Sequence, residues 1–88
     1  MKRIVLDLRA FDDRGQAHAY IQEQLQLPEH YGKNLDALHD CLTDIREDTG
    51  IVLYLPENME RFAAGIRCVF EDACAENPHL YLIKEEEL

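Results

Sequence analysis

Residues 51–83, IVLYLPENMERFAAGIRCVFEDACAENPHLYLI, carry the pattern that decides the fold. Residues 51–55 are a short, continuous apolar run that a proline ends, which predicts a buried strand. From about residue 59 to 76 apolar residues recur at helical spacing, so a helix is predicted there. Residues 80–83 are again apolar and predict a last strand. A strand, a helix and a strand in this order indicate a parallel pair joined by a right-handed crossover.

The N-terminal half adds a strand and two helices. Residues 4–6, followed by Leu8, form another apolar run. Asp13 and Gln16 have the spacing of a capping box, and the helix that they open is expected to stop before Pro28. Asn34 is a good N-cap for a second helix reaching about Asp44. Residues 46–50 are polar and turn-like.

The predicted order is therefore β-α-α-β-α-β, an α/β fold with a small three-stranded parallel sheet packed by helices. The strand runs are continuous rather than alternating, which favours a sheet covered on both faces. At 88 residues the chain is expected to form one domain, 1–88, with residues 85–88 as a solvated acidic tail.

Charge and composition exclude several classes of protein. Nine Lys and Arg residues against eighteen Asp and Glu residues give a net charge of −9, which argues against direct binding to nucleic acid and suits a basic protein partner. No apolar run is long enough for a membrane span or a secretory signal. Cys41, Cys68 and Cys74 are odd in number and lack metal-binding spacing. They predict reduced thiols in a cytoplasmic protein without a bound metal.

The placement of the acidic residues is more informative than their number. Asp36 and Asp40 are four residues apart on the second helix, opposite its apolar stripe, and His39 and Thr43 lie near them. Asp72 and Glu76 repeat this spacing in the last two turns of the third helix, where the helix dipole disfavours anions. The pattern is compatible with a solvated acidic surface or with an anionic patch for a cationic ligand.

Catalysis is not indicated. The sequence has no glycine-rich phosphate loop, no HExxH and no GxSxG motif, and the carboxylates are predicted on helix exteriors rather than at strand ends. Its four histidines, at positions 18, 30, 39 and 79, are scattered and are expected to face solvent. We predict no catalytic residue and no cofactor.

Residues 27–43, LPEHYGKNLDALHDCLT, closely resemble the central motif of the barstar family of intracellular ribonuclease inhibitors. Residues 69–73, VFEDA, together with Glu76, are similar to the long C-terminal helix of that family. The likeness covers essentially the whole chain. It implies a barstar-like fold, a monomer when free, and a basic, extracellular-type, barnase-like ribonuclease as the partner.

The resemblance also implies which residues bind the partner. Asp40 matches the carboxylate that occupies the substrate-phosphate site of the ribonuclease, and Asp36 matches a second acidic contact. Gly32 would let the loop backbone approach closely. The implied partner-binding residues are His30, Gly32, Asn34, Leu35, Asp36, His39, Asp40, Thr43, Asp72 and Glu76.

The sequence departs from the family pattern around the acidic positions. His30 stands where a tyrosine is found in the family's well-studied member, His39 stands where it has a tryptophan, and Asp44-Ile45 replaces a glycine-tryptophan pair. Two alternatives stay open beside the inhibitor. One is a related acidic module, such as an immunity protein, for a different basic protein or toxin. The other is a small metal- or nucleotide-dependent enzyme.

Overall fold

The computed structural model describes residues 2–11, 13–55 and 61–83, with the backbone alone at 61 and 62. The elements follow the predicted order: β1 (Lys2–Asp7), α1 (Arg14–Leu25), α2 (Leu35–Thr43), β2 (Thr49–Tyr54), α3 (Arg61–Glu76) and β3 (Leu80–Ile83). The β-α-α-β-α-β prediction is confirmed. The predicted start of the third helix near Met59 and the predicted tail 85–88 lie outside the described residues.

The three strands form one parallel sheet in the order β1-β2-β3. Ile4, Ile51 and Leu82 lie side by side across it, and Val5, Val52 and Ile83 form the next row. Side chains alternate between the two faces of a strand, so these rows lie on opposite faces. The central strand begins at Thr49, two residues earlier than the apolar run predicted. Backbone pairing carries Thr49 and Gly50 into the strand although neither belongs to that run.

The described residues cover one face of the sheet and leave the other open, contrary to the prediction. Leu6, Ile51 and Leu80 belong to the core, whereas Val5 and Tyr81 on the opposite face are 47% and 45% exposed. In a sheet with this strand order, two crossovers of the same hand place their helices on the same side. The apolar runs were continuous because outer-face residues such as Val52 are shielded by neighbouring strands, not by a second layer of helices.

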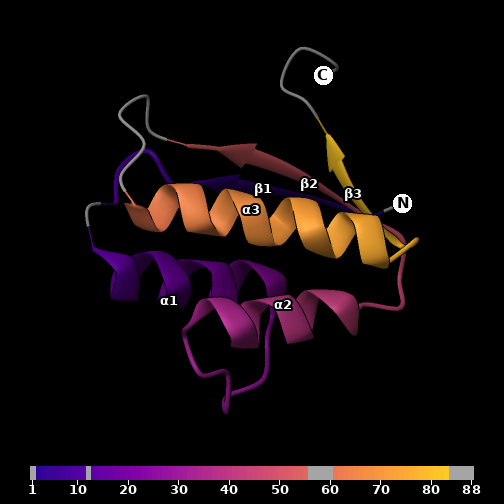
Figure 1. Cartoon of the computed structure of the whole chain (residues 1–88), viewed down its shortest axis with the longest axis horizontal. Coiled ribbons are helices and arrows are strands. Elements are labelled where there is room, and N and C mark those ends of the chain that lie inside the picture. Colours follow the sequence, from indigo (N-terminus) through magenta and orange to yellow (C-terminus); the bar gives the residue numbers. More distant parts are fainter. Residues whose placement is uncertain (1, 12, 56–60, 84–88) are drawn as a thin grey trace.

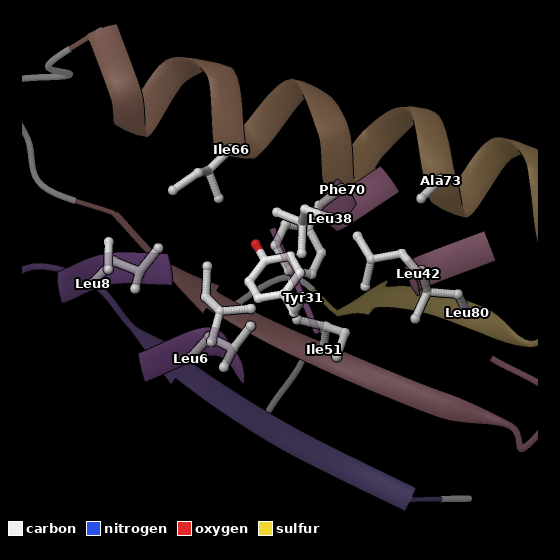
Figure 2. Close-up of a cluster of buried hydrophobic side chains, with 12 residues drawn as sticks. Leu6, Leu8, Tyr31, Leu38, Leu42, Ile51, Ile66, Phe70, Ala73 and Leu80 are labelled. Carbon is white, nitrogen blue, oxygen red and sulfur yellow. The ribbon is translucent and has the colours of Figure 1, made fainter. Parts of the chain in front are cut away.

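The core lies between the inner face of the sheet and the three helices (Figures 1 and 2). Figure 1 shows α3 lying along the sheet, with α1 and α2 beside it on the same side. Among the described residues, Phe70 of α3 is the largest fully buried side chain. The buried cluster consists of Leu6, Leu8, Ala17, Ile21, Tyr31, Leu38, Leu42, Ile51, Ile66, Phe70, Ala73 and Leu80.

The start of α1 is capped by Asp13, as predicted, but not by a capping box. The Asp13 carboxylate accepts a hydrogen bond from the Gly15 N–H at 2.7 Å, one residue before the position that a capping box uses. The helix ends at Gln26, which adopts a left-handed conformation with φ of 54° and whose N–H donates to the Gln22 and Glu23 carbonyls. This closure before Pro28 confirms the predicted end of the helix.

The one-sided core predicts a sharp contrast between inner and outer strand positions. Ile51→Ala removes a fully buried side chain and should lower the free energy of unfolding by about 2–5 kcal/mol. Val5→Ala, on the half-exposed outer face, should cost less than about 1 kcal/mol. Urea denaturation followed by circular dichroism measures both. Equal losses would contradict a core confined to one face.

Candidate protein-binding surface on α2 and α3

The orientation of α2 is set at its first turn and by its buried side chains. Asn34 caps the helix, because its side-chain oxygen accepts a hydrogen bond from the Ala37 N–H at 2.8 Å. Leu38 and Leu42 are fully buried. Asp36 and Asp40 lie on the opposite side of the helix, and both are exposed. The predicted acidic stripe is therefore present and faces outward.

Helix α3 is oriented by the same principle. Ile66, Phe70 and Ala73 are fully buried, which leaves Asp72 and Glu76 exposed on its outer side. Within the described part of the chain, no hydrogen bond or ion pair engages the side chains of Asp36, Asp40 or Asp72. Three carboxylates are thus left available to a ligand.

The two acidic helices are joined rather than separate. Helices α2 and α3 pack against each other, and the His39 Nε2 atom contacts the Glu76 carboxylate across the junction. Near the start of α2, the Leu35 side chain lies so close to α3 that a Cβ atom added at Gly65 would approach its Cδ1 to 2.9 Å. The small size of Gly65 permits this approach. The structure therefore brings the candidate site residues of α2 and α3 onto one continuous surface. We call it the acidic surface, after its four exposed carboxylates, Asp36, Asp40, Asp72 and Glu76.

Thr43 lies at the end of the stripe on α2, and, unlike the carboxylates of the stripe, its side chain forms hydrogen bonds within the helix. Its hydroxyl lies within hydrogen-bonding distance of the His39 and Asp40 carbonyls, at 3.0 and 3.1 Å, as is common for threonine inside a helix. With its proton directed back into the helix, the half-buried hydroxyl can still accept a hydrogen bond from outside. It suits a partner that presents an N–H donor.

His18, a residue of α1 whose burial the sequence did not predict, supports the loop before α2. His18 was expected to face solvent, but it is fully buried on α1. Its Nδ1 atom shares a 2.5 Å hydrogen bond with the Tyr31 hydroxyl, and Tyr31 is itself only 5% exposed. The expectation failed because the apolar stripe of α1 was assigned without knowing which loop would cover it. Tyr31 anchors the loop, while its neighbours His30 and Gly32 are exposed.

Gly32 of this loop does not have an unusual backbone conformation. The positive φ in this loop belongs to Lys33, at 53°, and no described glycine has a positive φ. A Cβ atom at Gly32 would instead lie 3.0 Å from the Asn34 side-chain nitrogen. Gly32 therefore makes room for the residue that caps α2, rather than supplying an unusual backbone conformation.

Burial disfavours the thiolate form of Cys41 and Cys74, because it raises the pKa of both thiols. All three described cysteines are free, and burial raises the pKa of the Cys41 thiol, with the nearby Asp44 and Asp40 carboxylates adding to the effect. A raised pKa leaves little of the nucleophilic thiolate at neutral pH.

Among the described residues, no three His, Cys, Asp or Glu side chains are grouped so that they could hold a metal ion. No helix in the described ranges is long and apolar enough to cross a membrane.

Comparison with known proteins identifies related sequences. A family model described as "Barstar (barnase inhibitor)" matches residues 1–79. A Bacillus subtilis (strain 168) protein, YrdF, named as a candidate ribonuclease inhibitor, is 44% identical over 43 residues, which is 49% of this chain and 47% of that protein. The chain thus spans about half the length of this relative.

The buried His18–Tyr31 pair predicts a pH-dependent stability. Burial lowers the pKa of His18, with nearby Arg14 acting in the same direction, and Nε2 has no hydrogen-bond partner among the described residues. The folded chain thus takes up the proton less readily than the unfolded chain, in which histidine has a pKa of about 6.5. Stability should be complete above that pH and should fall as the pH drops below it, by at most about 1.4 kcal/mol per pH unit for this one group.

Urea denaturation between pH 7.5 and pH 5 measures how steeply the free energy of unfolding changes with pH. His18→Asn, which keeps a polar atom near Nδ1, should flatten this dependence. The exposed His30→Asn serves as the matched control and should leave the slope unchanged. An identical slope in His18→Asn and the parent protein would show that His18 does not carry the effect.

Proposed function

This chain belongs to the barstar family, and from that premise we propose that it is an intracellular inhibitor of a barnase-like ribonuclease. In this proposal α2 and the loop before it plug the cationic active site of the enzyme. The chain transforms no substrate, so no residue is given a catalytic role. It acts in the cytoplasm as a monomer when free, and its partner is a basic ribonuclease of the secreted type.

The observation that carries the proposal is the outward-facing carboxylate pair of α2. Asp36 and Asp40 are exposed, and no group in the described part of the chain pairs with either side chain. Like charges four residues apart cost a helix about 0.2–0.5 kcal/mol, so local helix stability does not favour this arrangement. A ribonuclease site holds phosphate with cations and N–H donors, and a carboxylate can occupy such a site in place of the phosphate.

The site residues divide into central and peripheral groups. We assign Asp40 to the phosphate position and Asp36 to a second cation beside it. Leu35 supplies an exposed apolar contact, and Thr43 supplies a hydrogen-bond acceptor. His30 and the Gly32 backbone extend the contact from the loop. Asn34 has both ends of its amide engaged within the chain, by Ala37 and Gly32, so it acts by holding the start of α2.

The α3 residues lie at the edge of the proposed contact. Asp72 is exposed and suits a peripheral salt bridge, whereas Glu76 is engaged by His39 and acts mainly through its charge. The His39–Glu76 contact also favours a second candidate function. Because the imidazole of His39 contacts Glu76, the surface has a different shape from one that carries a tryptophan at this position. The same acidic surface would then serve as an immunity-type module for another basic protein or toxin.

Removing the central carboxylate tests the inhibitor proposal. Asp40→Ala should weaken binding to barnase by about 2–5 kcal/mol, a range that itself draws on the barnase–barstar complex, because it leaves buried cations of the enzyme without a partner. Asp72→Ala should cost about 0.2–1 kcal/mol, since an edge pair stays hydrated. Calorimetric titration against catalytically inactive barnase measures both losses.

Glu23→Ala is the charge-matched control, because Glu23 is exposed on α1 and outside the acidic surface. It should leave the affinity nearly unchanged. Asp40→Ala should also keep its fold, checked by circular dichroism, since it relieves repulsion with Asp36. Equal, small losses for Asp40→Ala and Glu23→Ala would identify the stripe as a solvated surface and would refute the proposal. Tight binding to a different basic protein but not to barnase would favour the second candidate.

The net charge of −9 predicts how fast the complex forms. Association with a basic enzyme should be accelerated at low salt and should slow markedly as salt screens the attraction. Stopped-flow mixing with inactive barnase from about 10 mM to 0.15 M salt, over which the Debye length falls from about 30 to 8 Å, measures the effect. A rate that stays flat over this range would exclude electrostatic steering.

A further inference from the structure

A buried asparagine at the end of α3 makes contact with the acidic helix from the inside. Asn77 is the first residue after α3 and is 4% exposed. Its side-chain nitrogen donates to the Leu42 carbonyl at 2.9 Å and to the Ile45 carbonyl at 3.0 Å. Its side-chain oxygen accepts from the His79 N–H at 2.9 Å. One side chain therefore ties α2 to the connection between α3 and β3.

The backbone of Asn77 is engaged as well. Its N–H donates to the Ala73 carbonyl at 2.8 Å, and its carbonyl accepts from the Leu80 N–H at 3.1 Å. These bonds fix Asn77 itself between α3 and β3. With its backbone held in this way, the Asn77 side chain is a rigid support for the Leu42 and Ile45 carbonyls.

The end of α2 needs such a support. The last carbonyls of a helix have no partner within the helix, and the usual remedies are a left-handed glycine or a basic side chain. Here the C-cap is Asp44 in a right-handed conformation, with φ of −87°, and the last turn contains no basic residue. The Ile45 N–H reaches the Leu42 carbonyl at 3.3 Å, and Asn77, 35 residues away in the sequence, adds a shorter hydrogen bond of 2.9 Å to the same carbonyl.

We propose that Asn77 is a positioning residue for partner binding: it fixes the C-terminal turn of α2 and thereby the placement of Asp40 and Thr43. This inference rests on the proposed function of the acidic surface. Asp40 and Thr43 lie in the last turn of α2, next to the Leu42 carbonyl that Asn77 holds. A carboxylate that enters a site of fixed cations must be held to within about 0.5 Å, so a loosened turn loses affinity without losing a contact residue.

The matched control is Thr49, another buried polar residue, whose side chain makes no hydrogen bond to α2 within the described part of the chain. Thr49 is 3% exposed, and its hydroxyl donates to the Glu47 carbonyl at 2.7 Å. Thr49→Val thus removes one partly buried side chain–backbone hydrogen bond that does not involve α2. It separates a general loss of stability from a loss of positioning.

The test compares Asn77→Ala and Thr49→Val in the full-length chain, binding catalytically inactive barnase at a temperature where both variants are fully folded. Asn77→Ala should weaken affinity about tenfold or more, mainly through faster dissociation, while Thr49→Val should stay within about twofold. Asn77→Ser, whose short hydroxyl can serve only one carbonyl, should fall between Asn77→Ala and the parent protein.

A double-mutant cycle distinguishes positioning from a merely structural role. In the Asp40→Ala background, Asn77→Ala should lose less than about threefold, because the group that it positions is gone. An undiminished loss in that background, or equal losses for Asn77→Ala and Thr49→Val, would overturn the inference.

Hydrogen exchange of the free protein makes the inference independent of the partner. Asn77→Ala should speed amide exchange at Asp44 and Ile45 about tenfold or more, and leave Ile51 in the sheet unchanged. Unchanged exchange at Asp44 and Ile45 would refute positioning. If exchange changes as expected and the parent protein does not bind barnase, the barnase-like target of the proposed function fails while the support of α2 by Asn77 stands.

Discussion

The burial of Leu38 and Leu42 determines which side chains of α2 face solvent. Helix α2 has only nine residues, so two fully buried side chains determine how it is rotated about its axis. Their burial places Asp36 and Asp40 on the opposite side, where both are exposed. The same apolar contacts that close the core thus direct the two carboxylates outward. A rotation large enough to hide these carboxylates would expose leucine and cost about 1.5–3 kcal/mol for each side chain.

A one-sided architecture makes this arrangement possible. All three helices lie on one face of the sheet, so α2 has α3 as its neighbour and solvent on its outer side (Figure 1). The approach of the two helices depends on Gly65, which leaves room for Leu35, and on Asn77, which receives the end of α2. The proposed partner-facing residues of α2 are therefore carried on a short helix that is held at its start by Asn34 and at its end by Asn77. Such support lowers the ordering cost that binding would otherwise incur.

The placement of the acidic residues lowers the local stability of α2 and α3, although the fold does not require this placement. Asp36 and Asp40 repel each other, and Asp72 and Glu76 lie where the helix dipole disfavours anions. Within the part of the chain that the structure describes, only Glu76 among these four has a cross-helix contact, with His39. Departures from local stability of this kind concentrate at functional sites. The proposed function would explain this departure, because a cationic partner would supply the missing counter-charges.

Local patterns were sufficient for the element order, the caps at Asp13 and Asn34, and the outward stripe of Asp36 and Asp40. Each follows from spacing within about four residues, which the periodicity of a helix or strand translates directly into a face. The burial of His18 and the support from Asn77 could not be found this way. Their partners are 13 and 35 residues away, and a polar residue looks the same in sequence whether water or a distant backbone satisfies it. The open face of the sheet was hidden for a related reason: the shielding of Val52 comes from neighbouring strands, which only the assembled sheet brings together.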